Sequence, residues 1–523
     1  MRHEGTAAAS SGSASSLVEL LSSWAATRPE QVVYTFLDGA GQNPATLSFA
    51  ALDRQARAVA AHLGEDAAGE RALLLYPPGL DFIVAFLGCL YARTIAVPAY
   101  PPRPGRGLDR LRGIAVDCGA SVVLTTAASR AGVRAIAGQL PELAGARFLA
   151  TDELPSGAPA PRPERLPAGF ETAFLQYTSG STADPKGVAV THDNLLHNEE
   201  MIRRAFEQDE RSVVVGWLPL YHDMGLIGNV LQPLYLGAQA VLMSPLSFLQ
   251  RPRRWLEAIT RYRATTSGGP NFAYELCVRR IGATDRGSLD LSSWRVAFNG
   301  AEPVRARTLA AFAEAFAGCG FRQEAFYPCY GLAEATLFAT GGAAGAAPLV
   351  SRFVATALEE NRVVAAAAAA GSRPLVSCGH PWMGQEVAVV EPASRRRCAA
   401  DQVGEIWLAG PSVAQGYWGR EETTAEEFRG RLAGEPASGP FLRTGDLGFL
   451  RDGELFVTGR AKELIILGGR NLYPQDVELA AESAHAALRP GRGAAFGVEV
   501  EGEERLVIAW ELDRHAAVDV EQV

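Results

Sequence analysis

The sequence is poor in lysine. Of its 49 lysine and arginine residues, only two are lysines, Lys186 and Lys462. Arginine therefore serves in this chain wherever a positive charge alone is needed. A retained lysine suggests a site that requires the compact, flexible ammonium group, which a planar guanidinium cannot replace. The alternative is that both lysines survive by chance on solvated surfaces, and only the residues around them distinguish the two explanations.

Other absences narrow the class of protein. The seven cysteines are scattered and never spaced as C-x-x-C, which predicts reduced cytoplasmic thiols rather than a disulfide framework or a zinc site. Residues 1–16 are rich in Ala, Ser and Gly without the apolar core of a secretory signal. The longest apolar run, residues 82–92, ends at Arg93 and is too short to span a bilayer. A net charge of −9 argues against nucleic acid as the main partner.

The pattern of apolar residues predicts an α/β protein. A chain of 523 residues is too long for one compact domain, so two or three packed units are expected. Apolar runs that read as strands, at 71–76 and 120–125, alternate with a helical stretch at 80–91, which indicates βαβ units and largely parallel sheets. After residue 375 the runs are shorter and separated by glycines, as in antiparallel strands. These runs lie at 387–390, 405–409 and 454–458, and residues 365–370 form a helix-prone, low-complexity stretch.

The most specific motif is the segment YTSGSTADPKG, residues 177–187. It lies between two predicted strands, 172–178 and 188–191, and small hydroxyl donors with a glycine suit the close approach of an oligophosphate. Lys186 can reach phosphate oxygens, but it does not open a helix after glycine, so this is not the Walker loop. A Ser/Thr-rich surface loop is the structural alternative. The predicted phosphate-binding residues are Thr178, Ser179, Gly180, Ser181, Thr182 and Lys186.

Together with four later motifs, this loop resembles the signatures of the adenylate-forming superfamily, which includes acyl-CoA synthetases, luciferases and the adenylation domains of peptide synthetases. In order, these motifs are NGAEP at 299–303, YGLAEAT at 330–336, TGDLG at 444–448 and GRAKE at 459–463. The resemblance implies a large N-terminal domain, residues 17–458, of two βαβ-type subdomains and a small β-barrel-like subdomain. A small, truncated α+β C-terminal domain, residues 459–523, would follow, and residues 1–16 would form a flexible tail.

The resemblance also implies roles for individual residues. Glu334 would bind Mg²⁺ and act in catalysis with Lys186, while Asp446 would accept hydrogen bonds from the ribose. Lys462 occupies the hinge position about which the C-terminal domain would rotate. The remaining ATP-binding residues implied are Asn299, Gly300, Ala301, Glu302, Tyr330, Gly331, Leu332, Ala333 and Arg460, with the Tyr330 ring stacked on adenine.

The segment YHDMGLIG, residues 221–228, closely resembles the fatty-acyl-AMP ligase branch, as do residues 331–336 and 469–474. His222 lies where the family has a residue near the reacting carboxylate. The branch has an additional segment, here about residues 350–374, that disfavours coenzyme A, although a tolerated surface loop is the alternative. The substrate pocket would include His222, Asp223, Met224, Gly225 and Gly228.

The implied activity is ATP-dependent conversion of a medium- or long-chain fatty acid to acyl-AMP, with release of pyrophosphate. The acyl group would then pass to the phosphopantetheine of an acyl carrier protein, in lipid, polyketide or lipopeptide biosynthesis. A fatty acyl-CoA synthetase has the same nucleotide motifs and remains an alternative. A catalytically idle acyl- or nucleotide-binding domain is another, and an amino acid substrate is disfavoured.

Two positions depart from the family pattern. Ala183 stands where the loop usually has glycine, at a cost of roughly 1 kcal/mol if that position needs positive φ. The family's C-terminal domain also has a late catalytic lysine, yet no lysine follows Lys462 here. We therefore expect the sequence to be a fragment, and adenylation to be impaired if Val523 is the natural end.

Overall fold

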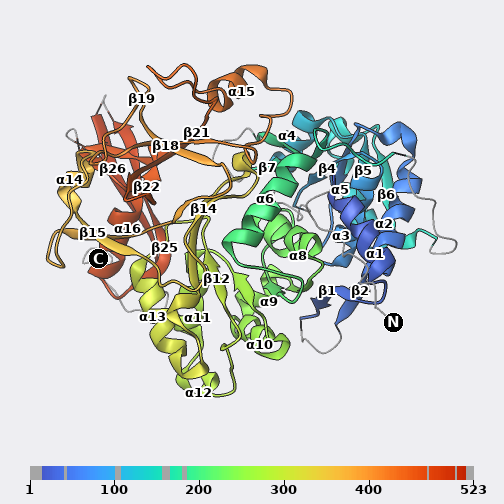
Figure 1. The fold of residues 1–523 in the computed structure, drawn as a ribbon, viewed down its shortest axis with the longest axis horizontal. Helices are drawn as coiled ribbons and strands as arrows, with labels where there is room; N and C mark the ends of the chain where they lie inside the picture. The colour runs from blue at the N-terminus through green and yellow to red at the C-terminus, as the bar shows by residue number, and fades with distance from the viewer. Residues whose placement is uncertain are drawn as a thin grey trace, which may run out of the picture.

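The computed structural model describes residues 14–39, 44–100, 108–155, 165–178, 185–467, 470–500 and 503–513. Two largely parallel sheets with covering helices form the first part of the chain, and antiparallel strands form the last part (Figure 1). The predicted α/β fold, with a large N-terminal part and a small C-terminal one, is confirmed. Among the described residues, no helix has both the length and the apolar character that crossing a membrane requires.

The first sheet contains the predicted βαβ units. Its strand order is β6-β5-β3-β4-β7-β8, and all neighbours are parallel except β7 and β8. The strands are β3 (Arg71–Leu74), β4 (Ile95–Pro98), β5 (Val122–Thr125), β6 (Arg147–Ala150), β7 (Thr172–Tyr177) and β8 (Gly187–Thr191). The accompanying helices are α2 (Phe49–Leu63), α3 (Leu80–Tyr91), α4 (Leu108–Cys118) and α5 (Ala127–Ala137). The helix predicted at 80–91 and the strands predicted at 71–76 and 120–125 are therefore present.

Helix α3 is buried on all sides after its first two residues, which accounts for its almost entirely apolar sequence. All ten of its residues from Phe82 to Tyr91 are buried. Gly88 allows α2 to pack closely against it, since a Cβ at this position would lie 2.5 Å from Cβ of Val59. A buried core helix, rather than a membrane-spanning segment, explains this apolar run.

The second sheet has nine strands in the order β17-β14-β13-β12-β11-β9-β10-β1-β2. The six strands from β13 to β1 are parallel, and the outer strands are antiparallel. The strands are β1 (Val32–Leu37), β2 (Ala45–Ser48), β9 (Val213–Gly216), β10 (Gln239–Met243), β11 (Thr266–Gly268), β12 (Val296–Asn299), β13 (Phe326–Gly331), β14 (Phe338–Gly341) and β17 (His380–Pro381). Ligands of open α/β sheets bind at the carboxyl ends of the strands.

Helix α6 (His192–Ala205) directly follows β8 and packs against the second sheet (Figure 1). It begins at Thr191, whose hydroxyl accepts a hydrogen bond from the backbone N–H of Asn194. The Asn194 side chain accepts one from the backbone N–H of Thr191 in return, so two otherwise unpaired donors are satisfied. Asn198 then donates from Nδ2 to the carbonyl oxygen of Phe338 at 2.9 Å. These contacts hold α6 beside the strand ends of the second sheet.

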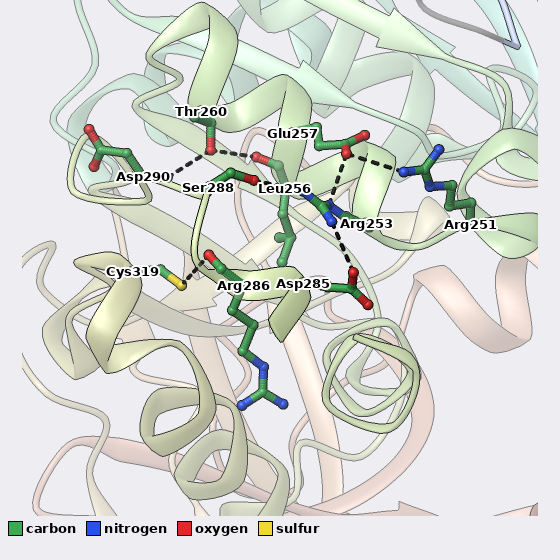
Figure 2. Close-up of polar contacts among 10 residues, drawn as sticks. All are labelled: Arg251, Arg253, Leu256, Glu257, Thr260, Asp285, Arg286, Ser288, Asp290 and Cys319. Carbon is green, nitrogen blue, oxygen red and sulfur yellow. Dashed lines mark hydrogen bonds and ion pairs between the residues drawn. The ribbon is translucent and has the colours of Figure 1, made fainter. Parts of the chain in front are cut away.

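Further helices of this part are α1 (Leu17–Thr27), α8 (Gln232–Leu236), α9 (Pro245–Gln250), α10 (Arg253–Tyr262), α11 (Asn271–Arg280), α12 (Ala283–Arg286) and α13 (Ala306–Phe316). Figure 2 shows how polar contacts join α10 to the segment after α12. Arg253 donates from Nη2 to Ser288 Oγ at 2.7 Å, and the Thr260 hydroxyl accepts from the Asp290 backbone at 3.1 Å. Because these contacts are exposed, we expect them to orient the helices more than to stabilise them.

A five-stranded antiparallel sheet follows, in the order β19-β18-β20-β21-β22. Its strands are β18 (Glu386–Glu391), β19 (Arg396–Arg397), β20 (Gly404–Ala409), β21 (Leu442–Arg451) and β22 (Glu454–Arg460), with α15 (Glu421–Phe428) before β21. The last elements are β23 (Ile465–Leu467), β24 (Arg470–Leu472), α16 (Pro474–Ala484), β25 (Leu488–Val500) and β26 (Glu503–Leu512). The predicted domain boundary at 458/459 falls within β22, and the division into domains stays a prediction.

The segment predicted as a family-specific insertion, about 350–374, forms a hairpin. Strands β15 (Val350–Val354) and β16 (Ser372–Val376) pair around the short helix α14 (Ala355–Glu359). Residues 365–370, expected to be helix-prone, are not helical, and Ala365 makes a β-bridge to Phe353 instead. The Phe353 ring is buried 4.9 Å from that of Phe449 in the five-stranded sheet. The segment therefore packs on the protein through its own apolar anchor.

Candidate active site

One cavity brings together most of the predicted site residues. It has a volume of about 630 Å³ and lies where the two parallel sheets, the five-stranded sheet and the turn after β22 meet. Both lysines of the chain line it. The other predicted residues that line it are Thr178, His222, Asp223, Met224, Gly228, Gly300, Ala301, Tyr330, Gly331, Leu332, Ala333, Glu334 and Arg460. Chance survival of the two lysines on solvated surfaces does not explain this convergence.

Four predicted residues do not line the cavity. Gly225 packs inside its own turn, where a Cβ would lie 2.1 Å from the carbonyl oxygen of Pro219. Glu302 is exposed and accepts a hydrogen bond from the backbone N–H of Phe272. Asn299 and Asp446 are buried beside the cavity, and their surroundings are described below. Ser179, Gly180, Ser181 and Thr182 lie outside the described residues.

The lysine of the predicted phosphate-binding loop, Lys186, contacts side chains from α15 and from the segment before it. Lys186 Nζ lies 2.8 Å from Glu427 Oε1 and 4.6 Å from the centre of the Tyr417 ring. The Tyr417 hydroxyl is 2.7 Å from Glu427 Oε2 and 3.0 Å from Glu334 Oε1. A chain of four residues therefore links the predicted phosphate-binding lysine to the predicted metal ligand.

The two carboxylates of this chain have different electrostatic surroundings. Burial raises the pKa of Glu334, and the nearby Glu427 and Asp223 raise it further. Burial also raises the pKa of Glu427. Hydrogen bonds from Lys186 and Tyr417 outweigh this effect, so the pKa of Glu427 is lowered. Among the described residues, Glu334 forms no ion pair, and its side chain is hydrogen-bonded to the Tyr417 hydroxyl. A half-buried carboxylate without an ion-pair partner gains from a bound metal ion.

Asp117 of α4 forms hydrogen bonds with both ends of the predicted phosphate-binding loop, at Tyr177 and at Gly187. Its Oδ2 accepts hydrogen bonds from the Tyr177 hydroxyl at 2.7 Å and from the Gly187 backbone at 3.3 Å. Its Oδ1 lies 2.8 Å from Arg420, which also donates to the carbonyl oxygen of Pro185. Asp117 therefore sets where the loop leaves β7 and where it enters β8.

His222 directly precedes the short helix α7 (Asp223–Leu226) and has a carboxylate partner. Its Nδ1 lies 2.5 Å from Asp223 Oδ1, which also accepts from the Met224 backbone at 2.7 Å. Burial of the imidazole opposes its positive charge, but the Asp223 carboxylate outweighs this and raises the pKa of His222. The pair therefore presents a readily protonated imidazole to the cavity.

The predicted adenine and ribose end is built from Tyr330, Asp446 and Arg460. The Tyr330 hydroxyl donates to Asp446 Oδ2 at 2.6 Å, and Arg460 Nε lies 3.0 Å from Oδ1. Burial raises the pKa of Asp446, although Arg460 and Tyr330 oppose this. Asn299 is fully buried nearby, and neither polar atom of its amide has a partner among the described residues. An unpaired buried amide is typical of a site that a ligand or water completes.

Sequence reasoning missed Tyr417, Glu427, Asp117 and Arg420. Glu427 is 241 residues from Lys186, and Arg420 is 303 residues from Asp117. None of them belongs to one of the recognised motifs, so only the packing of α15 and α4 around the loop identifies them. The retained Lys186 was the single signal in the sequence that such a partner is needed.

The family model of AMP-binding enzymes matches residues 21–418. The chain belongs to this family. It is 46% identical over 520 residues to the medium-chain-fatty-acid–[acyl-carrier-protein] ligase JamA of Moorena producens, covering 97% of this chain and 88% of that protein. It is 36% identical to the ligase of the same description, TtuA, of Teredinibacter turnerae, covering 93% of this chain and 83% of that protein.

Two solved structures are also similar to this chain. A fatty acid AMP ligase from Legionella pneumophila superposes with a TM-score of 0.83 at 42% identity, covering 99% of this chain and 89% of that one. A fatty acyl-adenylate ligase from L. pneumophila in complex with acyl adenylate and pyrophosphate gives a TM-score of 0.81, also at 42% identity, and covers 99% and 90% of the two chains. The predicted resemblance to the fatty-acyl-AMP ligase branch is confirmed.

Proposed function

We propose that this AMP-binding enzyme converts a fatty acid and ATP to acyl-AMP and pyrophosphate, and then transfers the acyl group to the phosphopantetheine of an acyl carrier protein. The observation that carries the proposal is that one cavity has both charged and apolar lining residues, which we describe as its charged end and its apolar arm. Lys186, Lys462, His222 and Glu334 line the charged end. Ile202, Phe206, Phe298, Leu337 and Phe338 line the apolar arm.

In the proposed first step, a carboxylate oxygen of the acid attacks the α-phosphorus of ATP. The bond between the α-phosphorus and the bridging oxygen breaks, and pyrophosphate leaves with that bonding pair. The chemistry depends on bringing two anions together and balancing their charge. Lys186 would bind phosphate oxygens after exchanging Glu427 for them, and protonated His222 would bind the carboxylate of the acid.

The residues present fit a magnesium ion. Glu334 lies half-buried at the cavity wall, and it shares the Tyr417 hydroxyl with the carboxylate of Glu427. Among the described residues, no group of three or more His, Cys, Asp and Glu side chains could hold a metal by itself. Mg²⁺ is often bound by one or two carboxylates together with phosphate oxygens, and when bound it neutralises charge on those oxygens.

The proposed acceptor rests on the predicted insertion, about residues 350–374, and on the relatives that are named acyl-carrier-protein ligases. This segment touches the C-terminal elements. Arg373 lies 3.0 Å from Asp476 and stacks over the Tyr473 ring at 4.7 Å, and Asn361 accepts from Asn471 at 3.2 Å. We propose that these contacts restrict the rotation of the C-terminal part about Lys462 that access of coenzyme A would require.

A two-stage assay tests the proposal. The protein is incubated with ATP, Mg²⁺ and a fatty acid, and acyl-AMP is sought by mass spectrometry. Phosphopantetheinylated carrier protein or coenzyme A is then added to separate portions. We expect acyl-AMP in the first stage and acylated carrier in the second. Acyl-coenzyme A without acylated carrier would favour the acyl-CoA synthetase alternative, and binding of ATP without acyl-AMP would favour an idle binding domain.

The His222–Asp223 pair predicts a pH dependence. If protonated His222 binds the substrate carboxylate, kcat/KM for the fatty acid should fall as the pH rises through the raised pKa of His222. In Asp223→Asn the imidazole loses the partner that raises its pKa, so the same fall should occur at lower pH. Initial rates of acyl-AMP formation across pH measure this. An unchanged falling limb in Asp223→Asn would show that another group controls it.

The Asp117 contacts predict a selective effect on ATP. Asp117→Asn keeps the shape of the side chain but removes the charge that faces Arg420 and one acceptor at the loop. We expect KM for ATP to rise roughly three- to tenfold, in proportion to one or two lost hydrogen bonds. KM for the fatty acid should stay unchanged, because Asp117 does not line the cavity. Equal increases in both constants would indicate general misfolding rather than displacement of the loop.

A further inference from the structure

The apolar arm of the cavity runs away from the charged end along helix α6. Asn198 of this helix is bonded to the carbonyl oxygen of Phe338, about two turns before α6 ends at Ala205. Ile202 and Phe206 follow one turn apart on the cavity wall, and Gln208 comes after them. From Asn198 to Ala205, where α6 ends, seven residues at about 1.5 Å each correspond to roughly 10 Å along the helix axis. The chain then turns back, and the Gln208 backbone N–H donates to the carbonyl oxygen of Arg203.

The strands of the second sheet also indicate that the apolar arm extends away from the charged end. Thr266, which lines the cavity, is the first residue of β11 and pairs with Val296, the first residue of β12. Gly300 lines the cavity just beyond the other end of β12. At about 3.3 Å per residue, Thr266 lies roughly 13 Å deeper in the sheet than Gly300. Gln208 and Thr266 therefore stand together at the far end of the apolar arm.

This far end is polar, unlike the walls that lead to it. Gln208 Nε2 donates to Thr266 Oγ1 at 3.0 Å, and Gln232 Nε2 donates to Gln208 Oε1 at 2.9 Å. The amide of Gln232 in turn contacts the carboxyl group of Glu199. All four side chains are buried, so a row of polar groups runs from the core of the protein to the end of the arm.

The row contains one ionisable group, Glu199. Its burial raises the pKa of the carboxyl group well above its ordinary value, which favours the neutral, protonated form. A protonated Glu199 can donate to Gln232, and each following group then donates to the next, which leaves the Thr266 hydroxyl hydrogen without an acceptor among the described residues. The oxygen and nitrogen of the Gln208 and Gln232 amides can also be exchanged. Each hydrogen bond of the row then has the opposite direction, the Thr266 hydroxyl donates to Gln208, and its oxygen keeps a free lone pair.

Building on the proposed function, we propose that the acid this enzyme activates has a hydroxyl group at the far end of its chain, bound by Thr266 and Gln208. A hydroxyl both donates and accepts, so it completes the row in either direction. Among the described residues, none of the lysines and arginines that line the cavity belongs to α6, β11 or β12. A second carboxylate would therefore be buried there without a partner.

Competing substrates test this proposal. Acyl-AMP formation is measured with straight-chain fatty acids, their ω-hydroxy counterparts and the corresponding dicarboxylic acids of equal length. We expect kcat/KM for the best ω-hydroxy acid to exceed that of the matching fatty acid about five- to tenfold, as one additional buried hydrogen bond allows. Dicarboxylic acids should be the poorest substrates. A wild-type enzyme that prefers the unsubstituted acid at every length would overturn the proposal.

Two variants locate the effect. Thr266→Val keeps the shape of the side chain and removes the hydroxyl, and Gln208→Leu removes the amide. Both should reduce the preference for the ω-hydroxy acid to about one, and Gln208→Leu should raise kcat/KM for unsubstituted acids. Ile202→Val, on the wall of the same arm, is the matched control and should change both substrates alike. An unaltered preference in Thr266→Val and Gln208→Leu would place the hydroxyl elsewhere.

The outcome is separable from that of the proposed function. Acyl-AMP formed from any of these acids supports the proposed activity, whichever acid is preferred. Absence of acyl-AMP with all of them would contradict the activity itself. Thermal unfolding of each variant identifies loss of the fold, and the ratio of the two kcat/KM values within one variant does not depend on the concentration of folded protein.

Discussion

Lys186→Ala is expected to slow acyl-AMP formation roughly 10²- to 10³-fold, which is the usual cost of removing one preorganised group from a developing charge. Lys186 is the cation beside Glu427 and Tyr417, at the end of the loop that Asp117 fastens. Its removal leaves the phosphates facing Glu427 without a counter-charge. The rate is measured by mass spectrometry of acyl-AMP, and fatty-acid binding is measured separately by calorimetry.

The controls for this prediction come from the same cavity. Lys186→Arg keeps the charge, but its planar group does not fit between Glu427 and the Tyr417 ring in the same way, so partial loss is expected. Fatty-acid binding should stay within about twofold of the wild type, because Lys186 lies at the charged end and not on the apolar arm. Equal loss of ATP use and fatty-acid binding in Lys186→Ala would point to misfolding.

Glu334→Gln is expected to raise the Mg²⁺ concentration for half-maximal activity at least about tenfold, the scale seen when metal-site residues are changed. Glutamine has the same shape but no negative charge, and it is a weak ligand for a hard cation. Because burial already raises the pKa of Glu334, a neutral side chain is well tolerated there. The variant should therefore be at least as stable to heat as the wild type at neutral pH.

Two measurements check the role of Glu334. The first is the magnesium titration of acyl-AMP formation. The second is the rise in unfolding temperature caused by Mg²⁺ with ATP, which does not depend on turnover and should shrink in Glu334→Gln. Tyr417→Phe is the matched control, since it removes the hydroxyl at 3.0 Å from Glu334 but keeps the carboxylate. An unchanged magnesium titration in Glu334→Gln would contradict the metal assignment.

Much of the site follows from the sequence because its groups come from short contiguous segments. Thr178 and Lys186 lie at the two described ends of the predicted phosphate-binding segment. The turn around Tyr330 and Glu334 and the segment after β22 likewise place groups that are close in sequence. These segments line one cavity, as the resemblance implied. The helix predicted at residues 80–91 is present as α3. An unbroken apolar run of that length between two strands is compatible with few structures other than a buried helix.

Other expectations failed for reasons of packing. Residues 365–370 are rich in alanine and were expected to favour a helix, yet they run beside β15 without forming one. Propensity decides the structure of such a segment only where tertiary contacts do not, and here the buried Phe353 anchors the hairpin. Gly225 was expected to line the pocket, but it is needed where its own turn closes on Pro219.

By itself, the sequence determined the family, the α/β architecture and the identity of the nucleotide motifs, because each motif is read over a few consecutive residues. The retention of only two lysines marked Lys186 and Lys462, and both line the cavity. Only the tertiary structure decided which groups face them. Glu427 and Tyr417 reach Lys186, and Gln208 reaches Thr266, through the packing of helices on sheets, and contacts between residues so far apart in the chain leave no local pattern.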